Sequence, residues 1–300
     1  MIFQKNVHNP EGPVCLPDGS WLITEMDHNA ISHVSYDGTS KRVIAQTGLP
    51  NGLTVDMESN IWVADAKWRM LLAVSMEGEI TEVSQGNPNF PFLLPNDLCF
   101  GPDNAIYMTD SGILLDEISN LANPMEAYET SYDGRVFRID PITRDCTLID
   151  RGLKLTNGIA FGLQGNDLYV AETITGNIFR YIIIDGKSIG ERELFSNVMI
   201  KPPHEYKRIA GPDGIAFDRE GNLYVAVLIQ GDITVITPSG EVKERIKLEG
   251  NLPTNLAFDS LEKKRILVCE ASKNQLLLIE TEHCGLPLFP HRSKINIQER

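Results

Sequence analysis

The chain has 300 residues, of which 42% are hydrophobic and 23% are charged, an ordinary composition for a soluble globular protein. Its formal net charge of −14 opposes nucleic-acid binding, which needs a basic face. No apolar run approaches the ~20 residues that cross a membrane, and MIFQKNVHNPEGP at the start lacks a signal-peptide pattern.

The five cysteines are scattered along the chain, and no pair shows the CxxC spacing of a zinc knuckle or redox motif. Their number is odd, and Cys15, Cys99 and Cys269 lie within or beside apolar strand patterns. We interpret them as buried thiols in a reducing compartment. We therefore expect a cytoplasmic protein.

The predicted elements are short strands rich in Val, Ile, Leu, Tyr and Phe, separated by clusters of Gly, Pro, Asp and Asn. In chain order they include IWVAD at 61, AIYMTD at 105, LYVAET at 168 and LYVAVL at 223. No segment of useful length has helical periodicity, and the best candidate, 113–128, contains Asn123-Pro124. The chain is predicted to be all-β.

One unit recurs six times: a polar residue, a strand, a turn and a second strand, with an acidic residue at its end in five copies. The copies are EGPVCLPDGSWLITEM from 11, NGLTVDMESNIWVADA from 51, NDLCFGPDNAIYMTDS from 96, NGIAFGLQGNDLYVAET from 157, DGIAFDREGNLYVAVL from 213 and TNLAFDSLEKKRILVCEA from 254. Two more strands fit between copies.

This repeat predicts a β-propeller of six four-stranded blades, formed as a single domain by residues 1–300. A β-sandwich also has many short strands, but it does not repeat one motif six times. The last blade lacks an outer strand, and IFQKNV at 2–7 is free to supply it and close the ring.

Asn157-Gly158, in LTNGIAF, is by itself a strong hairpin-turn signal. In every copy, however, the turn follows the first strand, so Asn157 stands at the start of an inner strand. The first motif position should therefore recur six times around the axis, as Glu11, Asn51, Asn96, Asn157, Asp213 and Thr254.

All six of these side chains carry oxygen. Taken singly, each is explained by capping of a strand end. Converging on one axis, carboxylate and amide oxygens would repel one another without a cation, and hard cations such as Ca²⁺ take oxygen ligands. Four of the six are followed by glycine, which would let neighbouring backbone come close.

EGPV at 11, ND at 96, NGIAF at 157 and DGIAF at 213, in this order, resemble the motifs of the gluconolactonase, regucalcin and luciferin-regenerating-enzyme family. The order is also similar to that of the diisopropyl fluorophosphatases. The resemblance covers about residues 9–280. It implies a six-bladed propeller with one divalent metal ion in its channel, most simply Ca²⁺, with Zn²⁺, Mn²⁺, Mg²⁺ or Fe²⁺ as alternatives.

The resemblance also implies site residues. Glu11, Asn157 and Asp213 match metal ligands, and Asn96 matches a position that binds the metal or the substrate beside it. Asp213 is the candidate catalytic base or nucleophile. Ala216 and Ala257 stand where the fluorophosphatases hold a second, structural calcium, and Leu94 replaces an arginine of the animal lactonases. We expect no second calcium of that kind and a different substrate specificity.

The resulting hypothesis is a metal-dependent hydrolase that opens a small, sugar-derived lactone, with Asp213 as base. Predicted substrate contacts are Asn51, Asn96, Asp97, Asp110, Thr254 and His204. The alternatives are a phosphotriesterase of the fluorophosphatase kind and a non-catalytic ligand-binding propeller.

Two insertions, 111–134 and 185–210, are predicted near the active-site face, the first as a lid. An acid ends the second strand in five copies, and we expect a structural role for these acids in holding loops between blades. They are Glu25, Asp65, Asp110, Glu172 and Glu270.

Overall fold

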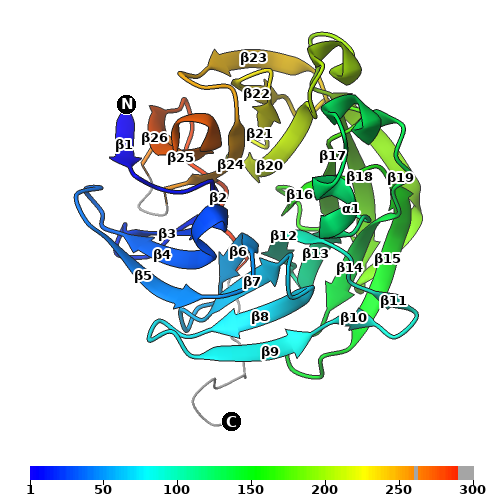
Figure 1. The fold of residues 1–300 in the computed structure, drawn as a ribbon, viewed down its shortest axis with the longest axis horizontal. Helices are drawn as coiled ribbons and strands as arrows, with labels where there is room; N and C mark the ends of the chain where they lie inside the picture. Colours follow the sequence, from blue (N-terminus) through cyan, green and yellow to red (C-terminus); the bar gives the residue numbers. More distant parts are fainter. Residues whose placement is uncertain (260–262, 290–300) are drawn as a thin grey trace.

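The strands form six four-stranded antiparallel sheets around a central axis in the computed structural model, which describes residues 1–259 and 263–289 (Figure 1). The six-bladed propeller predicted from the repeat is confirmed. Two parts of the prediction lie outside the described residues, namely residues 260–262 in the turn of the sixth copy and residues 290–300 at the end of the predicted domain.

The first three blades follow one another along the chain. From the innermost strand outward they are β2 (Pro10–Cys15), β3 (Trp21–Glu25), β4 (Ala30–Val34) and β5 (Lys41–Gln46); β6 (Pro50–Val55), β7 (Ile61–Asp65), β8 (Met70–Val74) and β9 (Ile80–Ser84); and β12 (Pro95–Phe100), β13 (Ile106–Asp110), β14 (Gly134–Ile139) and β15 (Cys146–Leu153). A small hairpin of β10 (Gly86–Asn87) and β11 (Phe90–Pro91) joins the second blade to the third.

The last three blades repeat this order, and the N-terminal strand completes the sixth. They are β16 (Thr156–Phe161), β17 (Asp167–Glu172), β18 (Asn177–Ile184) and β19 (Lys187–Asn197); β20 (Gly211–Phe217), β21 (Leu223–Leu228), β22 (Asp232–Ile236) and β23 (Val242–Lys247); and β24 (Pro253–Phe258), β25 (Arg265–Glu270), β26 (Gln275–Glu280) and β1 (Ile2–Lys5). The pairing of β1 with β26 confirms the predicted closure of the ring.

Short helical turns lie outside the blades. They are η1 (Met26–His28), α1 (Leu115–Ser119), η2 (Pro124–Tyr128), η3 (Pro203–Tyr206) and η4 (Ala271–Lys273). In the part of the chain that the structure describes, no helix is long and apolar enough to cross a membrane.

The core consists of six hydrophobic clusters, one at each junction between neighbouring blades. Alternate residues of a strand belong to different junctions: in β7, Trp62 packs toward the third blade and Val63 toward the first. Because both faces of every blade are buried, the middle strands read as continuous apolar runs rather than as an alternating pattern. The same packing brings the six inner strands into a closed ring of contacts around the axis.

The acids at the ends of the second strands hold the segments by which the chain enters each blade, as predicted. Asp65 accepts hydrogen bonds from the backbone N–H groups of Gly48 and Leu49, at 2.8 and 3.0 Å. Glu172 and Glu270 accept equivalent bonds from the segments before β16 and β24. In the fifth blade, where the acid is missing, Gln230 accepts from the backbone of Ile200 instead.

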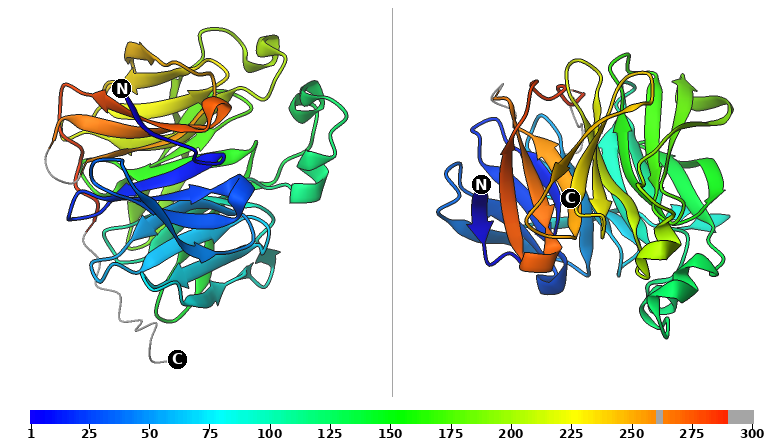
Figure 2. Two further views of the ribbon diagram at one scale, coloured as in Figure 1. Left: turned by 60° about the vertical axis from the view of Figure 1, so that its left-hand side comes forward. Right: turned by 90° about the horizontal axis from the view of Figure 1, so that it is seen from above.

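Residues 111–134 form a predicted insertion that carries α1 and η2, and it stands out from one face of the propeller (Figure 2). The second predicted insertion needs correction. Residues 187–197 of the range 185–210 are the outer strand β19, and the turn before this strand lies at the opposite end of the blade from Asn197. Only residues 198–210 form a loop beside the first insertion.

The two insertions touch each other. The hydroxyl of Tyr128 donates to the carbonyl of Arg208 at 2.7 Å and accepts from the N–H of Ala210 at 3.1 Å. Apolar side chains beneath them, including Ile113, Leu155 and Ile174, form a seventh cluster. The insertions therefore make one asymmetric wall over the third to fifth blades.

The closure of the propeller ring by β1 can be tested by deletion of this strand. Deletion of residues 1–5 leaves β26 as an unpaired edge and removes the partly buried Phe3 from the last junction, so we expect a lower melting temperature. Thermal unfolding followed by circular dichroism measures it, with substitution of the exposed Lys5 by alanine as the control. An unchanged melting temperature after the deletion would show that the ring does not depend on this strand.

Candidate active site

A β-bulge interrupts every inner strand at the repeated motif. In the first blade the pairing steps from Glu11 with Thr24 to Val14 with Leu22, which advances three residues on β2 for two on β3. The same extra residue occurs in the other five blades. A bulge changes the direction of the side chains beside it. Consequently, side chains from the first and second motif positions meet one another near the axis.

The second motif position is glycine in four blades, where the next blade comes too close for a side chain. A Cβ atom on Gly52 would overlap the carboxylate of Asp97, and one on Gly214 would overlap the amide of Asn255. The prediction that these glycines allow close approach is confirmed. Two of them make room for the two polar residues that occupy the second position in the neighbouring blades.

Glu11, Asp97 and Asn255 form a buried hydrogen-bonded group. The side-chain amide of Asn255 donates to Glu11 Oε2 at 2.9 Å and to Asp97 Oδ2 at 3.3 Å. Backbone N–H groups of Gly12 and Leu98 donate to the two carboxylates, at 2.8 and 2.9 Å. One amide thus bridges two acids from the first and third blades.

Asn157 and Asp213 come from neighbouring blades and are both buried. The Asn157 side-chain amide is hydrogen-bonded to the Asp213 carboxylate, and its Nδ2 donates to Thr173 Oγ1 at 3.2 Å. Threonine hydroxyls hold the backbone on each side. The Thr109 hydroxyl donates to the backbone carbonyl of Asn157 at 2.6 Å, and the Thr173 hydroxyl donates to the backbone carbonyl of Pro212 at 2.8 Å. Each blade thereby positions the motif residue of the next.

Burial is the main influence on the three acids. It raises the pKa of Glu11 to about 7, with a further contribution from the charge of Asp97, and it raises the pKa of Asp97 to about 6. Burial, followed by the charges of Glu11 and Asp97, raises the pKa of Asp213 well above its usual range. The three carboxylates are therefore close enough to repel one another in a desolvated place.

These residues fit a hard divalent cation. Among the described residues, no lysine or arginine forms a salt bridge with Glu11, Asp97 or Asp213. Carboxylate and amide oxygens are the donors that such a cation prefers, and its charge would offset the repulsion. The structure thus brings together the predicted ligands Glu11, Asn157 and Asp213.

The remaining predicted contacts have different surroundings. Asn51 is buried at the first motif position, and its backbone carbonyl accepts a hydrogen bond from the Thr24 hydroxyl at 2.6 Å. Asn96 is half-buried, and its amide donates to Ser111 Oγ at 3.1 Å, which ties it to the start of the 111–134 insertion. Asp97, also predicted as a substrate contact, lies in the buried acid group.

Two other predicted substrate contacts, Asp110 and Thr254, bond to backbone groups of neighbouring segments. Asp110 is fully buried, and its carboxylate accepts the backbone N–H groups of Leu93, Leu94 and Gly112. The Thr254 hydroxyl donates to the carbonyl of Pro10 at 2.7 Å, which joins the sixth blade to the first. Both side chains hold backbone, and the Thr254 side chain also faces the Glu11 carboxylate. His204 is exposed in η3, with its ring edge-to-face against Tyr128.

Asn255 is the residue that the sequence reasoning missed. It occupies the second motif position, directly after Thr254, whereas the predicted ring of polar residues included only the first position. A signal was present, because the second position is glycine in four copies and polar only in Asp97 and Asn255.

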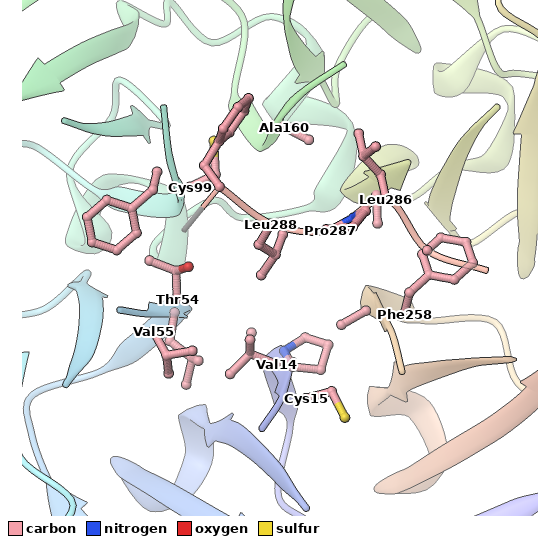
Figure 3. A pocket seen from close by; sticks show the side chains of 18 of the residues that line it. Val14, Cys15, Thr54, Val55, Cys99, Ala160, Phe258, Leu286, Pro287 and Leu288 are labelled. Carbon is pink, nitrogen blue, oxygen red and sulfur yellow. The ribbon is translucent and has the colours of Figure 1, made fainter. Parts of the chain in front are cut away.

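Beyond the acid group the channel becomes apolar. A cavity of about 450 Å³ extends from Asp97 and Asn255 toward the far ends of the inner strands. Leu286, Pro287 and Leu288 of the C-terminal segment lie across it, opposite Val14 and other apolar side chains (Figure 3). A backbone hydrogen bond of 2.8 Å from Leu286 to Phe217 anchors this segment. The insertions stand at the opposite end of the channel.

The fold and this site define a six-bladed propeller with a ring of buried acids and amides in its channel. Residues 9–272 match the SMP-30/Gluconolactonase/LRE-like region, and the chain belongs to that family. This confirms the resemblance based on the four ordered motifs.

Individual relatives are consistent with this family. A gluconolactonase of Zymomonas mobilis is 31% identical over 91% of this chain and 79% of its own length. The diisopropyl-fluorophosphatase of Loligo vulgaris is 25% identical over 98% of this chain and 95% of its own. In fold, the crystal structure of a calcium-binding protein, regucalcin, from Agrobacterium tumefaciens superposes with a TM-score of 0.80 over 97% of both chains at 18% identity.

The close approach at Gly52 and Gly214 can be tested by substitution with alanine. Each new methyl group would collide with Asp97 or Asn255 and displace the acid group, so we expect weaker Ca²⁺ binding in calorimetric titration. Gly190→Ala is the control, because a Cβ atom there meets no neighbour and only the backbone is strained. Wild-type affinity in both site variants would contradict this account.

The raised pKa values predict an inverted pH dependence of stability in the metal-free protein. Between the ordinary pKa of a carboxyl group and about pH 7, the folded state binds more protons than the unfolded state. The free energy of unfolding should therefore fall as the pH rises from about 5 to 7.5 in the presence of a chelator. Denaturant titration measures it.

The matched variants are Glu11→Gln, which should flatten this dependence, and the exposed Glu191→Gln, which should leave it unchanged. Saturating Ca²⁺ should remove the fall. A free energy of unfolding that rises over this range in chelator would refute the assignment.

Proposed function

We propose that this protein is a metal-dependent hydrolase that opens a small, sugar-derived lactone. The carrying observation is the buried group of Glu11, Asp97 and Asp213, which has no basic partner among the described residues and lies in the channel beside Asn157. Support for the reaction comes from the gluconolactonase of Zymomonas mobilis.

Glu11, Asn157 and Asp213 would hold the cation, with Asn96 beside them, and Ca²⁺ is the ion that best suits oxygen ligands. When bound, such an ion supplies Lewis-acid polarisation of the lactone carbonyl and lowers the pKa of water. Zn²⁺, Mn²⁺, Mg²⁺ and Fe²⁺ are the alternatives to be compared in reconstitution.

Asp213 is proposed as the base that takes the proton from the attacking water. It is buried, its pKa is raised by desolvation and by neighbouring acids, and a general base is most efficient when its pKa approaches the working pH. Asn51 and Asn96 would orient substrate hydroxyl groups, because both are amides at the first motif position.

Substrate specificity is proposed to lie in the wall made by residues 111–134 and 198–210. Asn96 is joined to it through Ser111, and His204 packs on Tyr128 within it. A substrate that enters from this end would meet the wall before it reaches the acids.

A phosphotriesterase activity is the second candidate. The observation that favours it is the 25% identity to the fluorophosphatase of Loligo vulgaris over nearly the whole of both chains. A cation with oxygen ligands can polarise a phosphoryl oxygen as well as a carbonyl oxygen.

We also infer a cytoplasmic location and a small-molecule substrate, with the chain a monomer or a weak homo-oligomer. None of the five cysteines, all of which lie in the described part of the chain, forms a disulfide, which suits a reducing compartment. Of the five, Cys15 and Cys269 are buried, whereas the prediction of buried thiols had included Cys99, which is half-buried.

Lactone opening by wild type and Asp213→Asn, followed by acid release, tests the proposal. At saturating Ca²⁺ we expect kcat to fall by at least about 100-fold, the low end for loss of a general base. Asp185→Asn, in an exposed turn away from the channel, is the control and should keep the wild-type rate. EDTA should abolish activity, and Ca²⁺ should restore it.

The outcomes are distinct. Full activity of Asp213→Asn would remove the proposed base. Hydrolysis of a fluorophosphate in preference to lactones would favour the second candidate. Failure to hydrolyse either substrate, together with tight binding of one, would support a non-catalytic propeller.

A further inference from the structure

A further cluster of side chains of the metal-ligating types lies where the ring closes, outside the channel. His8 lies between β1 and β2, Glu25 ends β3, and His28 lies in η1. One ligand atom from each residue lies within 4.8 Å of the others, and the two imidazole rings stack with centroids 3.5 Å apart. Among the described residues, no other three His, Cys, Asp or Glu side chains, the channel acids included, place one ligand atom each within 4.8 Å of one another.

Backbone hydrogen bonds hold these residues together. The N–H of His8 donates to Glu25 Oε2 at 3.0 Å. The N–H groups of Met26 and Asp27 donate to the carbonyls of Asn9 and His8, at 3.1 and 3.3 Å. The segment around His8 is thus fastened to the turn that carries His28, so the three ligands are positioned before any ion arrives.

We propose that His8, Glu25 and His28 form a second metal site, which takes Zn²⁺ or a similar first-row ion. Two imidazole nitrogens and one carboxylate oxygen are the donors that zinc prefers, whereas Ca²⁺ prefers oxygen alone. The site therefore differs in chemistry from the oxygen-only channel. The positions of these histidines in the sequence follow no metal-ligand spacing, and only the fold brings them together.

Lys41 would compete with a metal ion for the Glu25 carboxylate. Its Nζ donates to Glu25 Oε2 at 2.6 Å and to the carbonyl of Asn6 at 2.7 Å. The Glu25 carboxylate is fully buried and also accepts from Ser32, so it needs a cation beside it. The Lys41 side chain is 20% exposed and can turn toward solvent when a metal ion takes over this role.

The place of the site gives it a structural consequence. β1 belongs to the sixth blade, and the N–H of Asn9 donates to Asn274 of that blade at 3.1 Å. Glu25 and His28 belong to the first blade. A bound ion would link the chain beside the closing strand to the first blade, and an ion that binds only the folded state stabilises it.

The test uses zinc titration by calorimetry in full-length protein carrying Asp213→Asn, which disables the channel site. We expect one zinc ion to bind and to raise the melting temperature. Addition of His28→Ala should weaken zinc binding by at least about tenfold, since even the loss of an outer-sphere partner costs that much. Addition of His283→Ala is the control and should change nothing.

Equal zinc affinity with and without His28→Ala would overturn the site. Lys41→Met sharpens the test: removal of the competitor should tighten zinc binding, and unchanged or weaker binding would exclude Glu25 as a ligand. The rate of lactone opening by the single variant His28→Ala is measured in parallel. Loss or retention of this activity tests the function proposed for the channel and does not test the zinc site.

Discussion

The approach of six inner strands to one axis is the constraint on which the rest of the structure depends. Each blade is buried on both faces, so the blades pack side by side until the strands nearest the axis touch. A bulge in each of these strands turns two successive side-chain positions toward the channel. Glycine at Gly52 and Gly214 then leaves space for Asp97 and Asn255. The fold itself therefore concentrates oxygen atoms where there is little water.

The same residue types have two roles in this protein, and their partners distinguish the roles. Asp65 and Asp110 are fully buried, yet each accepts several backbone N–H groups that compensate its charge. Glu11 and Asp213 are equally deep in the protein but face other acids and amides. Burial of acids that face one another is unfavourable for folding unless a cation offsets their repulsion. This contrast separates the structural acids from the candidate catalytic ones.

The repeated scaffold is nearly symmetric, whereas the elements around it are not. Only the third to fifth blades carry the wall of residues 111–134 and 198–210. The opposite end of the channel is crossed by the C-terminal segment at Leu286–Leu288 (Figure 3). The joint between the sixth and first blades carries His8 and His28. The features that differ between blades are thus placed on a frame that the repeat makes.

The sequence by itself determined the propeller, because the repeat is local: each copy specifies a strand, a turn and a strand within about 20 residues. It also placed Glu11, Asn157 and Asp213 at equivalent points of three blades. The tertiary structure alone decided which side chains meet. The side-chain amide of Asn255 donates to Glu11 across 244 positions of the chain, and the Thr254 hydroxyl donates to the carbonyl of Pro10. These contacts exist only once the ring closes, and no spacing within one copy encodes them.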